Sequence, residues 1–154
     1  MSEASVISRI SETLGKNRIK SIQNPRERRV NLEIEKAELK DVASILKNEG
    51  FHHLSTITAQ EDSDVVEVIY HLSDGGNVVN MRVALPLNDT SLPTLTDVYP
   101  GAVLYEQEVN ELMGVEFLGH PSMGRFILPE QWPRGSYLLR KDKGEPLEKD
   151  EADN

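Results

Sequence analysis

The sequence contains no cysteine among its 154 residues. A disulfide framework, a thiolate zinc site and a cysteine-ligated iron–sulfur cluster are therefore excluded for this chain alone. Long apolar runs are also lacking, since the longest extend over about five residues and a membrane-spanning helix needs roughly 20. The first residues carry neither the basic segment nor the apolar run of a signal peptide. We expect any membrane association to come through a partner protein.

Positive charge is scarce as well. The chain has 17 Lys and Arg against 26 Asp and Glu, a net charge of −9 and a sequence pI near 4.9. This balance disfavours non-specific binding to nucleic acid or to an anionic membrane surface. The exception is the segment from Lys16 to Arg29, which has six basic residues and one acid. Because it lacks interleaved aromatic residues, we interpret it as a partner-facing or solvent-facing patch.

The hydrophobic pattern predicts a single α+β domain. Apolar residues at helical spacing, each series ended by a glycine, predict helices over residues 6–14, 39–46 and about 103–113. Alternating or β-branched runs predict strands over residues 30–34, 51–58, 64–72 and 77–85, with a tight Asp-Gly-Gly hairpin between the last two. A short strand is also expected between the glycine that ends the third helix and the Gly-His-Pro turn. We expect a largely antiparallel sheet with flanking helices and an extended carboxyl-terminal segment over residues 1–142, and a mobile charged tail over residues 143–154.

Carboxylates on the third predicted helix are the first candidates for chemistry. Glu108 and Glu111 are three residues apart and should share a face, with Glu106 one turn back. Paired carboxylates divide acid and base roles when burial separates their pKa values. Because Glu is seldom buried without a partner, a solvated helix face is the favoured interpretation. A free-standing hydrolase or isomerase using Glu108, Glu111 and His120 is the alternative.

Histidines do not form a predicted metal site. His52 and His53 are adjacent in a predicted strand and should point to opposite faces, and we interpret His71 as an ordinary residue of a sheet face. His120 stands before Pro121 in a Gly-His-Pro turn, and we interpret it as a turn-stabilising or interface residue. The sequence contains no HExxH, phosphate-binding loop, GxGxxG or GxSxG motif. We therefore expect no cofactor, no metal and no catalysis by the chain alone.

One run of motifs resembles a known family. Glu106 to Phe117 (EQEVNELMGVEF) is followed by Gly119-His120-Pro121, then by RFIL at 125–128 and YLLRKD at 137–142. This order resembles the signature of the thirty-kilodalton subunit of respiratory complex I, NADH-quinone oxidoreductase, and of its relatives in membrane-bound nickel–iron hydrogenases and archaeal respiratory complexes. The sequence departs from that pattern at four positions, where the family usually has Arg, Asp, Arg and Pro: Gln107, Glu111, Gly124 and Leu138.

The resemblance implies a cofactor-free structural subunit of the hydrophilic arm, on the cytoplasmic side of the membrane. Its partners would be the catalytic subunit that resembles a hydrogenase large subunit, and the iron–sulfur subunits. If Arg140 and Lys141 dock on an acidic groove of the larger subunit, replacing both with Glu should leave the isolated chain folded but weaken binding. We expect the following to be interface, signature or fold-closing residues: Glu106, Glu108, Glu111, Gly114, Gly119, His120, Pro121, Arg125, Arg140, Lys141 and Asp142.

Overall fold

The computed structural model describes residues 8, 10–13, 15, 19–26, 28–122, 137, 139 and 140. Residues 8 and 10–13 are helical, as the sequence predicts. The strands are β1 (Ile19–Arg26), β2 (Arg29–Ile34), β3 (His53–Asp62), β4 (Val65–Ser73), β5 (Val78–Pro86), β6 (Ser91–Pro93) and β7 (Glu116–Leu118). The helices are the short 3₁₀ helix η1 (Lys36–Glu38), α2 (Leu39–Asn48) and α3 (Ala102–Met113).

Five of these strands form one sheet in the order β1-β2-β5-β4-β3. The β2–β5 pair is parallel and the other three pairs are antiparallel. The predicted α+β domain on a largely antiparallel sheet is therefore confirmed. The β4–β5 hairpin also forms as predicted, because Asp74 Oδ1 accepts hydrogen bonds from the backbone N–H groups of Gly76 and Asn77.

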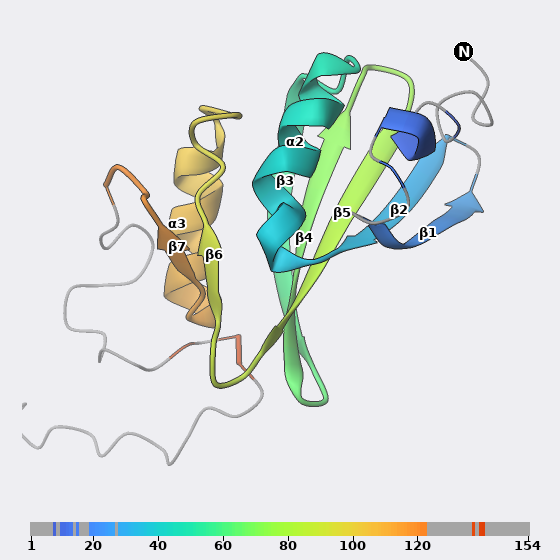
Figure 1. Ribbon diagram of the computed structural model, residues 1–154. Helices are drawn as coiled ribbons and strands as arrows, with labels where there is room; N and C mark the ends of the chain where they lie inside the picture. The colour runs from blue at the N-terminus through green and yellow to red at the C-terminus, as the bar shows by residue number, and fades with distance from the viewer. Residues whose placement is uncertain are drawn as a thin grey trace, which may run out of the picture.

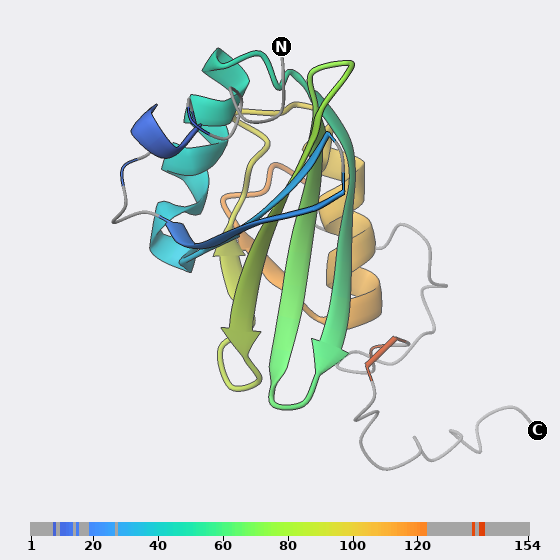
Figure 2. The same ribbon diagram turned by 90° about the vertical axis from the view of Figure 1, so that its right-hand side faces the viewer.

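Helices α2 and α3 lie on the same face of the sheet, and Figure 2 looks onto the opposite face (Figure 1, Figure 2). Side chains alternate between the two faces along each strand. Four residues of β5 point inward and are fully buried: Val79, Met81, Val83 and Leu85. Helix α2 covers part of this face with Leu39, Val42, Ala43 and Leu46. The hydrophobic core therefore lies between one face of the sheet and the two helices.

The opposite face, which we call the open sheet face, carries polar side chains that bond to one another. His71 bridges Thr58 and Asn80, at 3.0 Å from Thr58 Oγ1 and 2.8 Å from Asn80 Oδ1. The Asn80 side chain in turn donates to Asn31 Oδ1 at 2.9 Å. A hydrogen-bonded row thus crosses β3, β4, β5 and β2. His71 is, as predicted, an ordinary residue of a sheet face.

A second, two-stranded parallel sheet of β6 and β7 lies beside α3 (Figure 1). The loop that carries β6 is fastened by lysines of η1 and α2. Lys36 Nζ lies 3.2 Å from Asp89 Oδ2, and Lys40 Nζ lies 2.7 Å from Asp97 Oδ2. These ion pairs position the segment that leads into α3.

Two strands were not predicted from the sequence. Strand β1 occupies the basic segment, where register shifts between Ile19 and Ser21 and between Gln23 and Arg26 interrupt the alternation that marks a strand. Strand β6 has only three residues and ends at Pro93, so it is too short for a periodic pattern. Strand β3 also continues to Asp62, four residues beyond its predicted end. The predicted tail, 143–154, lies outside the described residues.

Candidate functional site

Helix α3 carries three of the predicted site residues, Glu106, Glu108 and Glu111, and its end is set by Gly114. Gly114 adopts a left-handed conformation with φ of 74°, and its N–H donates to Asn110 O at 3.0 Å. This is the backbone geometry that favours glycine after a helix. Thr90 Oγ1 then donates to Gly114 O, and the Asn110 side-chain amide donates to Val115 O. The chain therefore reverses at Gly114 and returns along α3 as β7.

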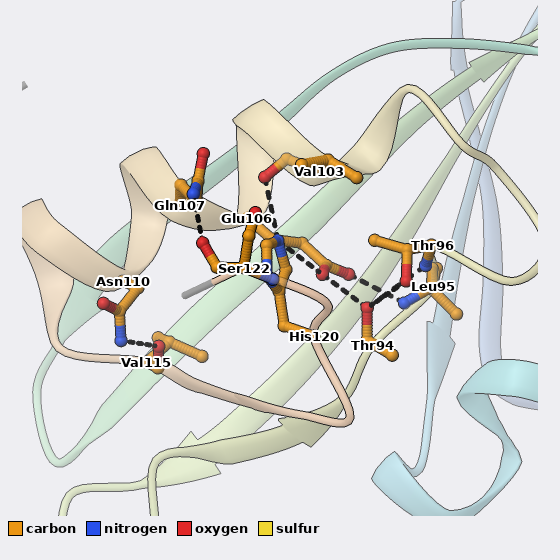
Figure 3. A network of polar contacts seen from close by, with 10 residues as sticks. All are labelled: Thr94, Leu95, Thr96, Val103, Glu106, Gln107, Asn110, Val115, His120 and Ser122. Carbon is orange, nitrogen blue, oxygen red and sulfur yellow. Dashed lines mark hydrogen bonds and ion pairs between the residues drawn. The ribbon is translucent and has the colours of Figure 1, made fainter. Parts of the chain in front are cut away.

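Glu106 is fully buried against the segment before the helix. Its Oε1 accepts a hydrogen bond from the Leu95 N–H at 2.7 Å, and its Oε2 accepts one from Thr94 Oγ1 at 2.6 Å (Figure 3). The Thr94 hydroxyl also lies 2.9 Å from Thr96 Oγ1. Glu106 thus supplies acceptors for a turn that would otherwise hold buried, unpaired donors.

Burial raises the pKa of the Glu106 carboxyl, and the hydrogen bonds from Leu95 and Thr94 partly offset that rise. Tyr70, on the inward face of β4, is also fully buried. Its pKa is raised well above its ordinary value, first by burial and second by the charge of Glu106. The Tyr70 hydroxyl has no hydrogen-bond partner in the described part of the chain. A carboxyl and a phenol group are therefore buried in the interior of the domain.

His120 bonds to two backbone groups with its two ring nitrogens (Figure 3). The Ser122 N–H donates to Nδ1 at 3.1 Å, so Nδ1 must be an unprotonated acceptor. Nε2 lies 3.0 Å from Val103 O, which can only accept, so Nε2 carries the proton. The imidazole is thus neutral in this arrangement, and the 3.8 Å separation from Glu106 Oε2 is not an ion pair. His120 therefore stabilises the turn through its contacts with the backbone.

The other residues of the Gly-His-Pro turn, and Gln107 on α3, also fix the course of the backbone after β7. Gly119 has φ of 85° and lies beside Thr94, and Pro121 is exposed. Gln107, which stands where the family usually has Arg, is buried and donates a side-chain hydrogen bond to Ser122 O. Gln107 and His120 together tie the turn to α3.

Residues 137, 139 and 140 close the fold at the carboxyl end of α3. A Cβ atom at Gly114 would lie 2.6 Å from Cδ2 of Tyr137, so the Tyr137 ring occupies the space that glycine leaves. The Leu139 N–H donates to Leu112 O at 3.0 Å, and Arg140 Nη1 donates to Met113 O at 3.1 Å. The positive guanidinium also lies beside the negative, carboxyl-terminal end of the helix dipole, and this interaction is favourable.

Arg140 lies mostly inside the domain. Its side chain is 13% exposed, and its Nε is 3.8 Å from Oε2 of Glu61, whose side chain is 4% exposed. Arg140 is therefore largely desolvated within the domain itself. Arg140 bonds to the end of α3, whereas Arg125, Lys141 and Asp142 lie outside the described residues.

The prediction that the three glutamates lie on a solvated helix face is wrong for two of them. Glu106 and Glu111 are buried, at 0% and 7% exposure, and only Glu108 is exposed. Glu108 and Glu111 therefore do not share an environment. The reason is that α3 has neighbours on two sides, the β3 edge of the large sheet and the β6–β7 pair, so its buried stripe is wider than one face.

Sequence reasoning missed Thr94, Tyr70 and Glu61. Thr94 and Tyr70 have no local signal in the sequence, because only the folding of the chain brings them near Glu106. Glu61 does have one, since it continues the inward-facing series of β3 that includes Ile57. An acid on the inward row of a strand signals a buried partner.

Two further properties of the described residues bear on function. They contain no group of three or more His, Cys, Asp or Glu side chains that could hold a metal ion. No helix in the described ranges is long and apolar enough to cross a membrane.

Two solved structures share the fold. A chain of the membrane-bound sulfane sulfur reductase (MBS), an archaeal respiratory membrane complex, superimposes with a TM-score of 0.81 and 27% sequence identity, covering 92% of this chain and 85% of that one. The trypsin-resistant fragment (1–134) of Nqo5 superimposes with a TM-score of 0.66 and 24% identity, covering 79% of this chain and 99% of the fragment. At that identity the second likeness concerns the fold alone. The class of protein is thus an α+β domain found in a respiratory assembly.

The family follows from the sequence itself. The family model of the respiratory-chain NADH dehydrogenase 30 kDa subunit matches residues 32–152, and the chain belongs to this family. The C/D subunit of NADH-quinone oxidoreductase from Shewanella oneidensis is 44% identical over 77 residues, which is 49% of this chain and 12% of that protein. The C subunit of the same enzyme from Roseiflexus castenholzii is 37% identical over 78 residues, 49% of this chain and 44% of that protein. The matches thus span less than half the length of either relative.

Proposed function

We propose that the chain is a non-redox structural subunit of the hydrophilic arm of a membrane-associated, energy-converting oxidoreductase. It docks on the large catalytic subunit, the one that resembles a hydrogenase large subunit, on the cytoplasmic side of the membrane. Its role is to hold that subunit and the neighbouring iron–sulfur subunits in register, because electron tunnelling falls steeply with distance. Membership in the 30 kDa subunit family supports this assignment.

The observation that carries the proposal is how the signature side chains are used. Glu106 accepts from a backbone N–H and a threonine hydroxyl, and both nitrogens of His120 bond to backbone groups. Groups engaged in this way hold the backbone in place and are not presented to a substrate. The segment that resembles the family most closely is therefore built as a rigid support, which suits a docking subunit.

The same observation argues against the alternative function, a free-standing hydrolase or isomerase. That alternative needs Glu108, Glu111 and His120 to work together, but Glu108 is exposed and Glu111 is buried. A general base must also present a free lone pair to the proton that it removes. In His120 the only unprotonated nitrogen, Nδ1, already accepts from Ser122.

Native co-purification tests the proposal. We expect an affinity-tagged chain, expressed in its source organism in place of the untagged copy and extracted with a mild detergent, to purify with the large catalytic subunit and iron–sulfur subunits in fixed stoichiometry. Quantitative mass spectrometry and iron analysis of the purified sample measure this. Recovery of the chain alone, together with turnover of a substrate that is lost in Glu111→Gln, would contradict the proposal and favour the hydrolase or isomerase.

A further inference from the structure

Helix α3 presents a line of residues on its outer side. Leu104, Glu108 and Leu112 are spaced four residues apart and therefore lie in a row along the helix surface. Leu104 is 53% exposed, Glu108 is exposed and Leu112 is half-buried. At 1.5 Å per residue the row is about 12 Å long.

Leu139 lies at the carboxyl end of the helix. Its N–H donates to Leu112 O at 3.0 Å, and its side chain is 56% exposed, the highest value among the large apolar side chains described. A single exposed leucine needs no explanation. Here the two most exposed of the described leucines lie near opposite ends of one helix, with an exposed acid on the helix between them. We call Leu104, Glu108, Leu112 and Leu139 the α3 ridge.

Glu108 gives the ridge its charge. Among the residues that the structure describes, no cation forms an ion pair or hydrogen bond with it. Glu106 and Glu111, its neighbours on the helix, are buried within the domain. Within the described part of the chain, the ridge therefore offers one unpaired carboxylate at its centre and apolar side chains on either side.

The open sheet face has a different character. Its side chains already bond across the strands, as in the row from Thr58 through His71 and Asn80. In the next row Arg82 lies 3.3 Å from Glu67 Oε1. A partner there would have to break these contacts or leave them as they are. Of the two surfaces, the α3 ridge is the one with a carboxylate that has no cation beside it in the described chain and with two exposed leucines, Leu104 and Leu139.

The charge of the ridge also decides against a second copy of this chain. In a two-fold symmetric contact the same patch meets itself, so the residue at the centre of the patch faces its own copy. Glu108 would then oppose Glu108, and like charges in contact cost several kcal/mol. A partner that supplies a cation at this point has no such penalty.

We infer that the α3 ridge docks on the large catalytic subunit, against an apolar surface that presents an Arg or Lys to Glu108. This inference rests on the proposed function and names the part of the chain that makes the contact. The ridge is built by the same segment that carries the family signature. Glu106, His120 and Arg140 hold that segment in place from within, while Leu104, Glu108 and Leu139 are exposed and Leu112 packs partly against the core.

The test uses the native co-purification described above with single substitutions in the tagged chain. Glu108→Arg places a cation opposite the partner's cation, and Leu104→Asp removes apolar contact while leaving a residue suited to the first turn of a helix. We expect each to lower the amount of large subunit recovered per chain by about tenfold or more. Asp41→Arg, the same kind of reversal at an exposed site on α2, is the matched control and should recover it at the wild-type level.

Urea denaturation of each isolated chain verifies that the variants fold. If folded Glu108→Arg and Leu104→Asp proteins recover the large subunit at the wild-type level, the ridge is not the docking site, although the proposed function stands. If the wild-type chain recovers no large subunit at all, the proposed function itself fails. These two failures are therefore distinguishable.

A photo-crosslinking amino acid in place of Leu104 gives independent information. We expect it to form a cross-link to the large subunit in the purified complex, and the same amino acid at Thr58, on the open sheet face, to form none. A cross-link from position 104 to a second copy of this chain, or one to the large subunit from position 58 alone, would overturn the inference.

Discussion

At the scale of single residues, Gly114 joins two parts of the domain. Its left-handed backbone ends α3, and the missing side chain leaves room for the Tyr137 ring. Gly15 has nearly the same φ, 71° against 74°, but no atom of the described residues lies within 4 Å of the place where its Cβ would be. The two glycines therefore separate the cost of backbone strain from the cost of a clash.

We expect Gly114→Ala to destabilise the isolated chain more than Gly15→Ala. Both variants carry a left-handed alanine at a cost of about 1–2 kcal/mol, but only the first must also displace Tyr137. The difference should be at least about 4 °C in Tm, which in a domain of this size corresponds to roughly 1 kcal/mol. Thermal denaturation followed by circular dichroism measures it. Equal Tm values for the two variants would mean that the Tyr137 contact contributes nothing.

Glu106 and Glu108 are two residues apart on one helix and differ in almost every physical respect. We expect Glu106→Ala to cost about 2–4 kcal/mol, because it leaves Thr94 and Leu95 with buried, unpaired donors and creates a cavity. The matched change Glu108→Ala is exposed and should stay within about 0.5 kcal/mol of wild type. Urea midpoints at constant m-value compare them. Similar midpoints would contradict the buried role of Glu106.

At the scale of elements, the carboxyl end of α3 is a junction between the helix, β3 and the segment that carries Arg140. Arg140 caps the helix through Met113 O and lies beside Glu61 of β3. Arg82 on the open sheet face also lies near an acid, Glu67, but both of those side chains are more exposed. Burial should therefore make the first contact the more important for stability.

We expect Arg140→Ala to lower the free energy of unfolding by about 1–3 kcal/mol, as removal of a charged hydrogen-bond donor from a buried site does. Arg82→Ala should cost about 1 kcal/mol or less, because exposed ion pairs contribute little. Urea denaturation of the isolated chain tests both. If Arg140→Ala unfolds at the wild-type midpoint, Arg140 is not a fold-closing residue and its docking role is open again.

At the scale of the whole molecule, stability should depend on the ionisation of Glu106. Its pKa in the folded protein is raised above the ordinary value of 4.5, so the folded state binds the proton more tightly than the unfolded state. Stability from this group is then highest at low pH and falls as the pH rises from about 4.5 through the raised pKa.

Glu106→Gln removes this titration while keeping the shape of the side chain. We expect the wild-type chain to gain stability relative to Glu106→Gln when the pH is lowered from 7 to 5. Urea denaturation of both proteins at the two pH values gives the difference directly. A difference that is constant, or that shrinks on acidification, would contradict the raised pKa.

The tail from Lys143 to Asn154 is almost entirely polar, so ordering it would bring little burial to offset the lost entropy. We expect deletion after Asp142 to change the Tm of the isolated chain by less than about 4 °C, or roughly 1 kcal/mol. A larger fall, measured by thermal denaturation against the full chain, would show that the tail packs on the domain.

The sequence by itself determined the features that depend on neighbours along the chain. Gly114 ends α3 and the Asp74 hairpin joins β4 to β5 because the backbone conformations involved are set within a few residues. The missing cysteines, the helix-and-turn motif and the 30 kDa subunit family were also predictable, because they are properties of residue order. Strand β1 was not, since its register shifts remove the periodic signal.

Only the tertiary structure decided which side chains of the signature face inward. Three glutamates on one helix look alike in sequence, but α3 is covered on two sides, so Glu106 and Glu111 are buried and Glu108 is left for solvent or a partner. Arg140 is similar, because its partners Met113 and Glu61 are 27 and 79 residues away along the chain (140 minus 113, and 140 minus 61). Burial and pairing depend on segments distant in sequence, and no local pattern encodes which of those segments will meet.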